Sequence, residues 1–185
     1  MAAHPKSQTK STIPRHGIIR LIDRLSTLCG WFAAAMILLS VLITCQMIYV
    51  RYVLNQSTVW QTEAVTYMMI ASTLVGLPYV QKLRGHVNVD LVPMMLSQRP
   101  RKLLAIVTLS VTILMVALIA IYGFEFWHVA WQRNWKSETV WPVRLWIPYL
   151  AVPVGFTMFL LQLLADLYLL ITDQDKPFNI DKEAL

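Results

Sequence analysis

The feature that most constrains this chain is a set of long apolar runs that contain no charged residue. Such runs cover residues 25–50, 64–81, 103–124 and 145–165. A bilayer core is about 30 Å thick and a helix rises about 1.5 Å per residue, so each run, extended by a few residues, is long enough to cross a membrane. The pattern therefore predicts four membrane-spanning helices.

Composition supports the membrane class. Of the 185 residues, 57% are hydrophobic and only 14% are charged, and the mean hydropathy is +0.54. These values leave no room for a large soluble domain. The net charge of +6 comes from short basic flanks between the apolar runs, which favours a role in membrane orientation over nucleic-acid binding.

The predicted fold class is therefore an all-α integral membrane protein with four helices. The helices are expected at about 25–51, 62–83, 102–131 and 145–171, between tails at 1–24 and 172–185. The first run is much longer than the roughly 7–15 apolar residues of a signal peptide, so we expect it to remain as a helix. Between the second and third helices, Asp90 and Pro93 predict a short interfacial helix over Leu91–Leu96.

The distribution of basic residues predicts the orientation. Twelve Lys and Arg residues lie on the side that holds both tails and the connection between helices two and three, and four lie on the opposite side. Because cytoplasmic segments carry the excess of positive charge, both termini are expected in the cytoplasm.

Three sets of residues carry a family resemblance, one before helix two, one after it and one at the start of helix four. They are Asn55, Ser57, Trp60 and Glu63; Arg84, Gly85, His86 and Asp90; and Trp146, Tyr149, Pro153 and Gly155. In the order and helix positions of these residues, the chain resembles the small membrane subunit (DctQ-type) of tripartite ATP-independent periplasmic (TRAP) transporters. The resemblance extends over nearly all of residues 25–171.

The resemblance implies that the chain is one of three components in a bacterial inner membrane. A periplasmic receptor would capture the solute, with an organic acid as the expected class, and a large membrane subunit would carry it using an ion gradient. This chain, surrounded by membrane lipids, would brace the large subunit. We expect no enzymatic activity and no cofactor.

Two carboxylates are candidates for a chemical site. Glu63 is a candidate for a proton relay, but a place in the first turn of helix two favours a structural role, in which it complements the positive helix end and pairs with Arg51. His86 and Asp90 are four residues apart, yet two ligands do not make a closed metal site, so we expect hydrogen bonding there and no metal.

Small residues predict where helices pack closely. Pairs four residues apart occur at Gly30 and Ala34, at Ser72 and Gly76, and at Ala151 and Gly155. Such pairs let helix backbones approach each other, so tight contacts are expected for helices one, two and four.

Three cations of the loop between helices three and four invite a binding hypothesis. Arg133, Lys136 and Arg144 could dock an acidic patch of the receptor, with charge pairing acting mainly on the association rate. Contact with lipid headgroups is the equally weighted alternative.

Two other function classes remain as alternatives. A haem-carrying electron-transfer subunit needs axial ligands, usually histidines, that face each other inside the bundle. The histidines are His4, His16, His86 and His128, and the predicted spans give no facing pair. A self-sufficient small transporter is the second alternative, although the chain lacks a matching pair of broken helices for a substrate site.

Overall fold

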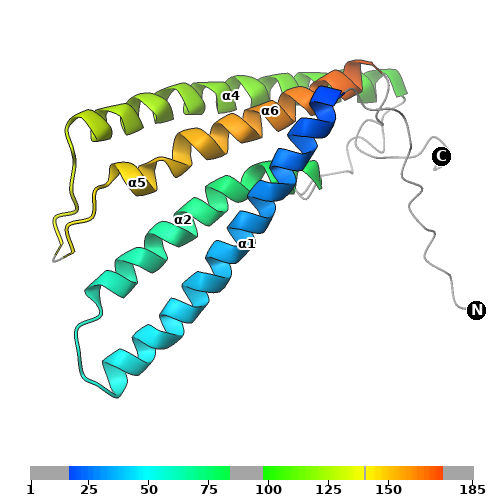
Figure 1. Cartoon of the computed structure of the whole chain (residues 1–185). Helices are drawn as coiled ribbons and strands as arrows, with labels where there is room; N and C mark the ends of the chain where they lie inside the picture. The colour runs from blue at the N-terminus through cyan, green and yellow to red at the C-terminus, as the bar shows by residue number, and fades with distance from the viewer. Residues whose placement is uncertain (1–16, 84–97, 140, 173–185) are drawn as a thin grey trace, which may run out of the picture.

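The computed structural model describes residues 17–83, 98–139 and 141–172 (Figure 1). The helices are α1 (Gly17–Tyr52), α2 (Val59–Lys82), α4 (Gln98–Gln132), α5 (Trp146–Tyr149) and α6 (Ala151–Ile171). This part of the chain contains no strand beyond one isolated antiparallel bridge between Lys136 and Arg144. The predicted all-α class is confirmed.

Four helical segments among the described residues have the length and apolar composition to cross a bilayer. They are α1, α2, α4 from Pro100 onward, and α5 together with α6. The prediction of four spans is thereby confirmed. α1 has 36 residues and α4 has 35, about 54 and 52 Å at 1.5 Å per residue, so both must tilt in the bilayer or extend beyond it.

Three helices begin earlier than the apolar runs indicated. α1 begins at Gly17 and not near residue 25, α2 begins at Val59 and not near residue 62, and α4 begins at Gln98 and not near residue 102. A helix satisfies its own backbone hydrogen bonds, so it can continue past the apolar run into the interface. The charged residues between positions 17 and 25 lie outside the apolar run of α1 but inside the helix.

The four long helices form an open row. α1 packs against α2, α2 packs against α6, and α6 packs against α4. Figure 1 shows the same order, with the α1–α2 pair and the α4–α6 pair closer together where α6 ends than where α5 begins. We call the end with the α1–α2 turn and the α4–α5 connection the hairpin end, and the opposite end the terminal end.

The packed centre of the row is on α6. Phe159 and Leu163 of α6 are buried against Val116 of α4. The partly buried side chains around them come from α2, α4 and α6: Leu77, Leu109, Ile113, Phe156 and Leu160. Side chains therefore fill the space between α6 and its two neighbours.

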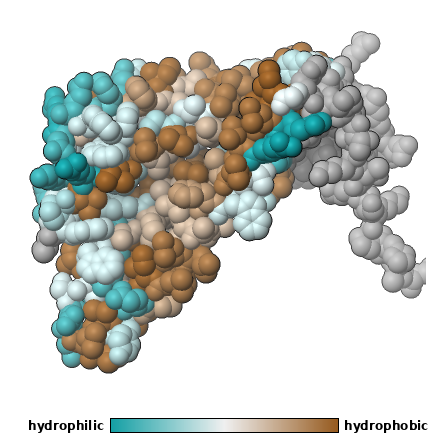
Figure 2. Space-filling view, in the orientation of Figure 1, coloured by the Kyte–Doolittle hydropathy of each residue, from teal (hydrophilic) through white to brown (hydrophobic). Residues whose placement is uncertain are grey.

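Helix α1 contacts the row through a narrow stripe of small residues. Ser26, Ala33 and Ser40 are each at most 6% exposed and lie seven residues apart. A seven-residue spacing keeps the same face of a helix toward its partner when two helices cross at about 20°. The rest of α1 exposes large apolar side chains, as does the outward face of α4, and Figure 2 shows the apolar surface between more polar ends.

The break between α5 and α6 follows from Pro153. Proline has no backbone N–H, so the Tyr149 carbonyl loses the donor that it would otherwise have four residues later. α5 ends at Tyr149, and α6 begins at Ala151 after a single linking residue.

Candidate functional site

The described residues hold no group of three or more His, Cys, Asp or Glu side chains that could bind a metal ion. Polar and aromatic side chains instead gather at the two ends of the row. These ends are the candidate functional regions, and six residues of the family resemblance lie at the hairpin end: Asn55, Ser57, Trp60, Glu63, Trp146 and Tyr149.

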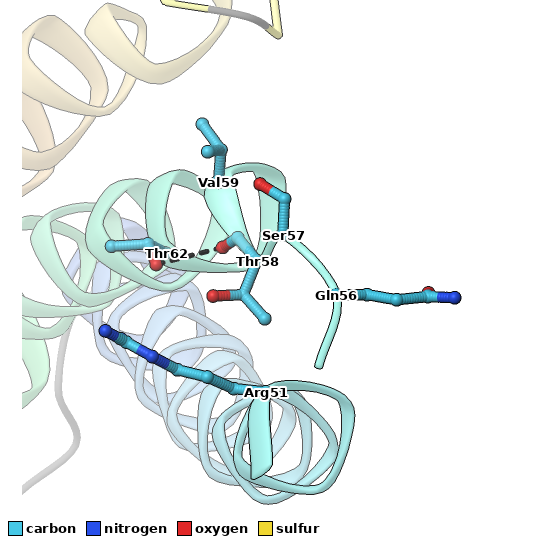
Figure 3. Close-up of a pocket in the computed structure, with 6 residues that line it drawn as sticks. All are labelled: Arg51, Gln56, Ser57, Thr58, Val59 and Thr62. Atoms are coloured by element: carbon cyan, nitrogen blue, oxygen red, sulfur yellow. Dashed lines mark hydrogen bonds between the residues drawn. The ribbon is translucent and has the colours of Figure 1, made fainter. Parts of the chain in front are cut away.

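Asn55 lies in the turn between α1 and α2 with a φ of 49°. Asparagine adopts this left-handed region more readily than most residues, which gives a physical reason for its place in the turn. Ser57, two residues later in the same turn, lines an open pocket of about 360 Å³ (Figure 3). The other lining residues are Arg51, Gln56, Thr58, Val59 and Thr62.

Glu63 lies in the second turn of α2, because the helix begins at Val59, so the predicted first-turn position is wrong. Its Oε2 accepts a hydrogen bond from the Ser137 hydroxyl at 3.5 Å. Its Oε1 is buried and has no hydrogen-bond partner among the described residues. The carboxylate therefore contacts the α4–α5 connection, and the predicted pairing with Arg51 is not formed.

Trp60 makes a second contact between α2 and this connection. Its ring meets Trp141 edge to face, with centroids 6.3 Å apart. The connection folds back on itself as a hairpin, because the Ser137 N–H donates to the Val143 carbonyl at 2.9 Å and the Leu145 N–H donates to the Trp135 carbonyl at 2.9 Å. We call residues 133–145 the outer hairpin.

The three cations considered for docking all belong to the outer hairpin. Arg133, Lys136 and Arg144 are exposed, and none forms an ion pair within the described residues. Lys136 and Arg144 face each other across the bridge between the two arms. The hairpin also exposes one acid, Glu138.

Trp146 and Tyr149 attach α5 to the end of α4. The Trp127 indole N–H donates to the Trp146 carbonyl at 3.1 Å, and the Trp146 ring lies 4.6 Å from that of Trp131. The Tyr149 ring lies 5.0 Å from that of Phe126. The aromatic residues of this end thus hold α4 and α5 together.

His128, near these aromatics, is the only histidine in the part of the chain that the structure describes. Its ring stacks on Phe124 at a centroid distance of 6.2 Å, and its Nε2 lies 3.4 Å from the Gln132 amide nitrogen.

Gly155 occupies a close approach between the backbones of α2 and α6. A Cβ at this position would lie 2.6 Å from the Leu74 carbonyl oxygen. Pro153, two residues earlier on the same helix, is also buried. Ala151, the partner of Gly155 in the predicted small-residue pair, is partly buried.

The other small-residue candidates lie between α1 and α2, with one exception. A Cβ on Gly30 would lie 2.4 Å from the Tyr79 ring, and one on Gly76 would lie 3.5 Å from the Ala33 Cβ. Ser72 is 3% exposed. Ala34 is exposed, and its neighbour Ala33 takes the inward position.

Arg84, Gly85, His86 and Asp90, with the predicted interfacial helix over Leu91–Leu96, lie outside the described residues.

The terminal end contains a hydrogen-bonded network that the sequence did not indicate. Ser26 of α1 donates to Gln162 Oε1 of α6 at 2.7 Å. Gln81 of α2 donates to Asp166 Oδ2 of α6 at 2.8 Å, and Gln162 donates to Asp166 Oδ1 at 3.3 Å. Both Ser26 and Gln162 are 2% exposed. The network therefore links α1, α2 and α6.

Lys82 adds a second link between α1 and α2. Its Nζ donates to the Asp23 carbonyl oxygen and to the Thr27 hydroxyl, each at 2.7 Å. We call these residues together with Ser26, Gln81, Gln162 and Asp166 the inner polar network.

One signal in the sequence could have revealed this network. Gln162 lies inside an apolar run, where an amide without a partner is costly. It therefore had to find a hydrogen bond on another helix. Its partner Ser26 could not be chosen from the sequence, because the two residues are 136 positions apart.

Comparisons with known proteins give two matches. A family model described as the DctQ component of tripartite ATP-independent periplasmic transporters matches residues 40–173. A protein of Vibrio cholerae serotype O1, the C4-dicarboxylate TRAP transporter small permease protein DctQ, is 26% identical over 166 residues, which cover 78% of this chain and 70% of that protein. No solved structure gives a significant match.

Proposed function

The chain belongs to the DctQ component family of tripartite ATP-independent periplasmic transporters, and from this membership we propose that it braces the large membrane subunit of such a transporter. It is a small permease subunit and a multi-pass protein of the bacterial inner membrane. In the proposed assembly a periplasmic receptor delivers an organic acid, and the large subunit moves it with an ion gradient. The relative from Vibrio cholerae is named for C4-dicarboxylates, which makes this class the first solute to test.

The open row of helices is the observation that carries the bracing role. The interior between α6 and its neighbours is filled with packed side chains. The lateral faces of α1 and α4 expose large apolar side chains such as Leu38 at 63% and Leu114 at 59%. Lipid can cover such a face, but so can the apolar surface of another membrane protein.

Crosslinking tests the bracing role directly. A photoreactive amino acid would replace exposed residues of α1, including Leu38, or exposed residues of α4, including Leu114, in cells that express all three components. We expect at least one of the two faces to crosslink to the large subunit. The buried position Leu163 serves as a control and should give no crosslink. An intact complex with no crosslink along either face would contradict the proposal.

Uptake measurements test the assembly. Cells that express the receptor and the large subunit without this chain should lose uptake of a radiolabelled C4-dicarboxylate, and restoring the chain should recover it. Uptake by this chain alone in proteoliposomes would instead favour a self-sufficient transporter. Uptake of a different organic acid only would leave the bracing role standing and correct the solute.

The orientation of the row is part of the proposal, with the hairpin end in the periplasm and both termini in the cytoplasm. Lys136→Cys in a chain that carries Cys29→Ala and Cys45→Ala would place one thiol on the outer hairpin. We expect a membrane-impermeant maleimide added to intact cells to label this thiol. Labelling only after the membrane is broken would reverse the orientation.

The exposed cations of the outer hairpin support a role in receptor docking. Replacing Arg133, Lys136 and Arg144 by Gln should slow receptor association at low salt and flatten its dependence on ionic strength, because exposed charges act mainly on the association rate. The matched control is Glu138→Gln, which removes the acid of the same hairpin and should not slow association. Equal rates for the wild type and the triple variant would dismiss docking here.

A further inference from the structure

From the pocket at the α1–α2 turn we infer a binding site for the phosphate of an anionic phospholipid headgroup in the outer leaflet. The pocket has a volume of about 360 Å³, which falls within the range of about 300–1,000 Å³ that is usual for small-molecule sites. Its six lining residues include one cation and no carboxylate. The pocket is therefore suited to a ligand that carries negative charge.

Arg51 supplies the charge. It is exposed at the end of α1 and has no hydrogen bond or ion pair within the described residues. Figure 3 shows its side chain extending along the pocket past Thr58 toward the side where Thr62 lies. A planar guanidinium can donate two parallel hydrogen bonds to a phosphate group.

Thr58 supplies a hydroxyl without a partner on a largely buried residue. The residue is only 9% exposed. Although it is the N-cap of α2, its side chain makes no capping hydrogen bond, and it makes no other in the described part of the chain. In Figure 3 its hydroxyl points toward the space beside the Arg51 side chain. The hydroxyl is free to donate to a ligand in the pocket, and an anionic oxygen there would accept its hydrogen bond.

The start of α2 adds donors of a third kind. The first backbone hydrogen bond of this helix runs from the Thr62 N–H to the Thr58 carbonyl. The preceding N–H groups, at residues 59–61, have no acceptor inside the helix, and the helix dipole places partial positive charge there. Phosphate groups bind at helix starts for these reasons.

Exposed aromatic residues within two positions of the lining residues in the sequence point to a lipid as the source of the phosphate. Tyr49 is 56% exposed, Tyr52 is 77% exposed and Trp60 is 45% exposed. Tyr and Trp favour the level of the lipid headgroups. Arg51 is also the first charged residue after the apolar run of α1. The pocket therefore lies where the headgroup of a phospholipid can reach it from the side.

The test uses the full chain purified with its large subunit in detergent, titrated with phosphatidylglycerol and followed by native mass spectrometry. Arg51→Gln should weaken lipid binding about tenfold, the effect of losing one hydrogen bond to a charged group. Thr58→Val should weaken it by a smaller factor, and Arg51→Lys should retain part of it. The matched controls are Arg24→Gln, near the start of α1 at the terminal end, and Thr73→Val, on the exposed face of α2, and both should bind as the wild type does.

Three outcomes would overturn the inference. The first is equal phosphatidylglycerol binding by the wild type, Arg51→Gln and Thr58→Val. The second is displacement of the lipid by millimolar inorganic phosphate or succinate, which would identify a site for free anions. The third is loss of the large subunit from Arg51→Gln while lipid binding is unchanged, which would identify a protein contact.

Discussion

Pro78 removes one backbone hydrogen bond from α2, and the carbonyl that loses its donor lies against Gly155 of α6. In a regular helix the N–H of residue 78 would donate to the Leu74 carbonyl, but proline has no N–H. The same carbonyl oxygen is the nearest atom to a Cβ built on Gly155, at 2.6 Å. Pro78 on α2 thus leaves the Leu74 carbonyl without its helical donor, and Gly155 on α6 leaves room for the same carbonyl.

We expect Gly155→Ala to destabilise the chain by about 1–3 kcal/mol, because the added methyl meets backbone that cannot move aside as a side chain can. Thermal unfolding of the purified protein in detergent would measure this effect. Gly76→Ala is the matched control, since its Cβ would lie at an ordinary 3.5 Å from Ala33. An unchanged midpoint for Gly155→Ala would show that α2 and α6 are farther apart than described.

At the scale of the helices, hydrogen bonds join α1, α2 and α6 at the terminal end. Those of the inner polar network measure 2.7 or 2.8 Å between helices. At the hairpin end the contact between the Gln61 amide and Gln46 of α1 is longer, at 3.5 Å. The hydrogen bonds that join α1 to its neighbours are therefore shorter at the terminal end than at the hairpin end.

A double-mutant cycle on Ser26 and Gln162 measures one link of the network. The two side chains are buried and hydrogen-bonded across 2.7 Å, so we expect Ser26→Ala and Gln162→Leu to show a coupling energy of about 0.6–1.7 kcal/mol, as found between membrane helices. The control cycle pairs Ser26→Ala with Thr108→Val on the exposed side of α4. Additive effects in the first cycle would exclude the hydrogen bond as a source of stability.

The contact of the outer hairpin with α2 gives a second prediction for the helices. Trp60→Ala removes an edge-to-face pair with Trp141 that contributes about 0.5–1.5 kcal/mol. We expect faster proteolysis within the outer hairpin, with little change in overall unfolding. Trp31→Ala, which removes a tryptophan that is 73% exposed on α1, is the control. Unchanged proteolysis would show that other contacts hold the hairpin.

The fold could be predicted from the sequence because a bilayer requires long apolar helices, whereas the contacts between them could not. Every face of α1 is apolar, so periodicity does not show which small residues face inward, and the stripe contains Ala33 where Ala34 was expected. The contact of Glu63 with Ser137 depends on a hairpin that returns to α2 from 74 residues away.

At the scale of the whole molecule, α6 is the element on which the row depends. Leu163→Ala should cost on the order of 2 kcal/mol or more, because its side chain is 2% exposed at the packed centre and would leave a cavity. Leu114→Ala makes the same change on the exposed face of α4. It should leave unfolding of the isolated chain unchanged. Similar losses of stability for the two variants would contradict the described centre of packing.

The shorter hydrogen bonds between helices at the terminal end have a consequence for how the bilayer acts on this protein. When the surrounding membrane becomes thinner or thicker, the long helices must change their tilt, and the short hydrogen bonds of the inner polar network resist this change where α6 ends. We therefore expect the change in tilt to alter the distance between the α1–α2 turn and the outer hairpin. Lipid composition would thereby alter the geometry of the surface that the proposed receptor meets.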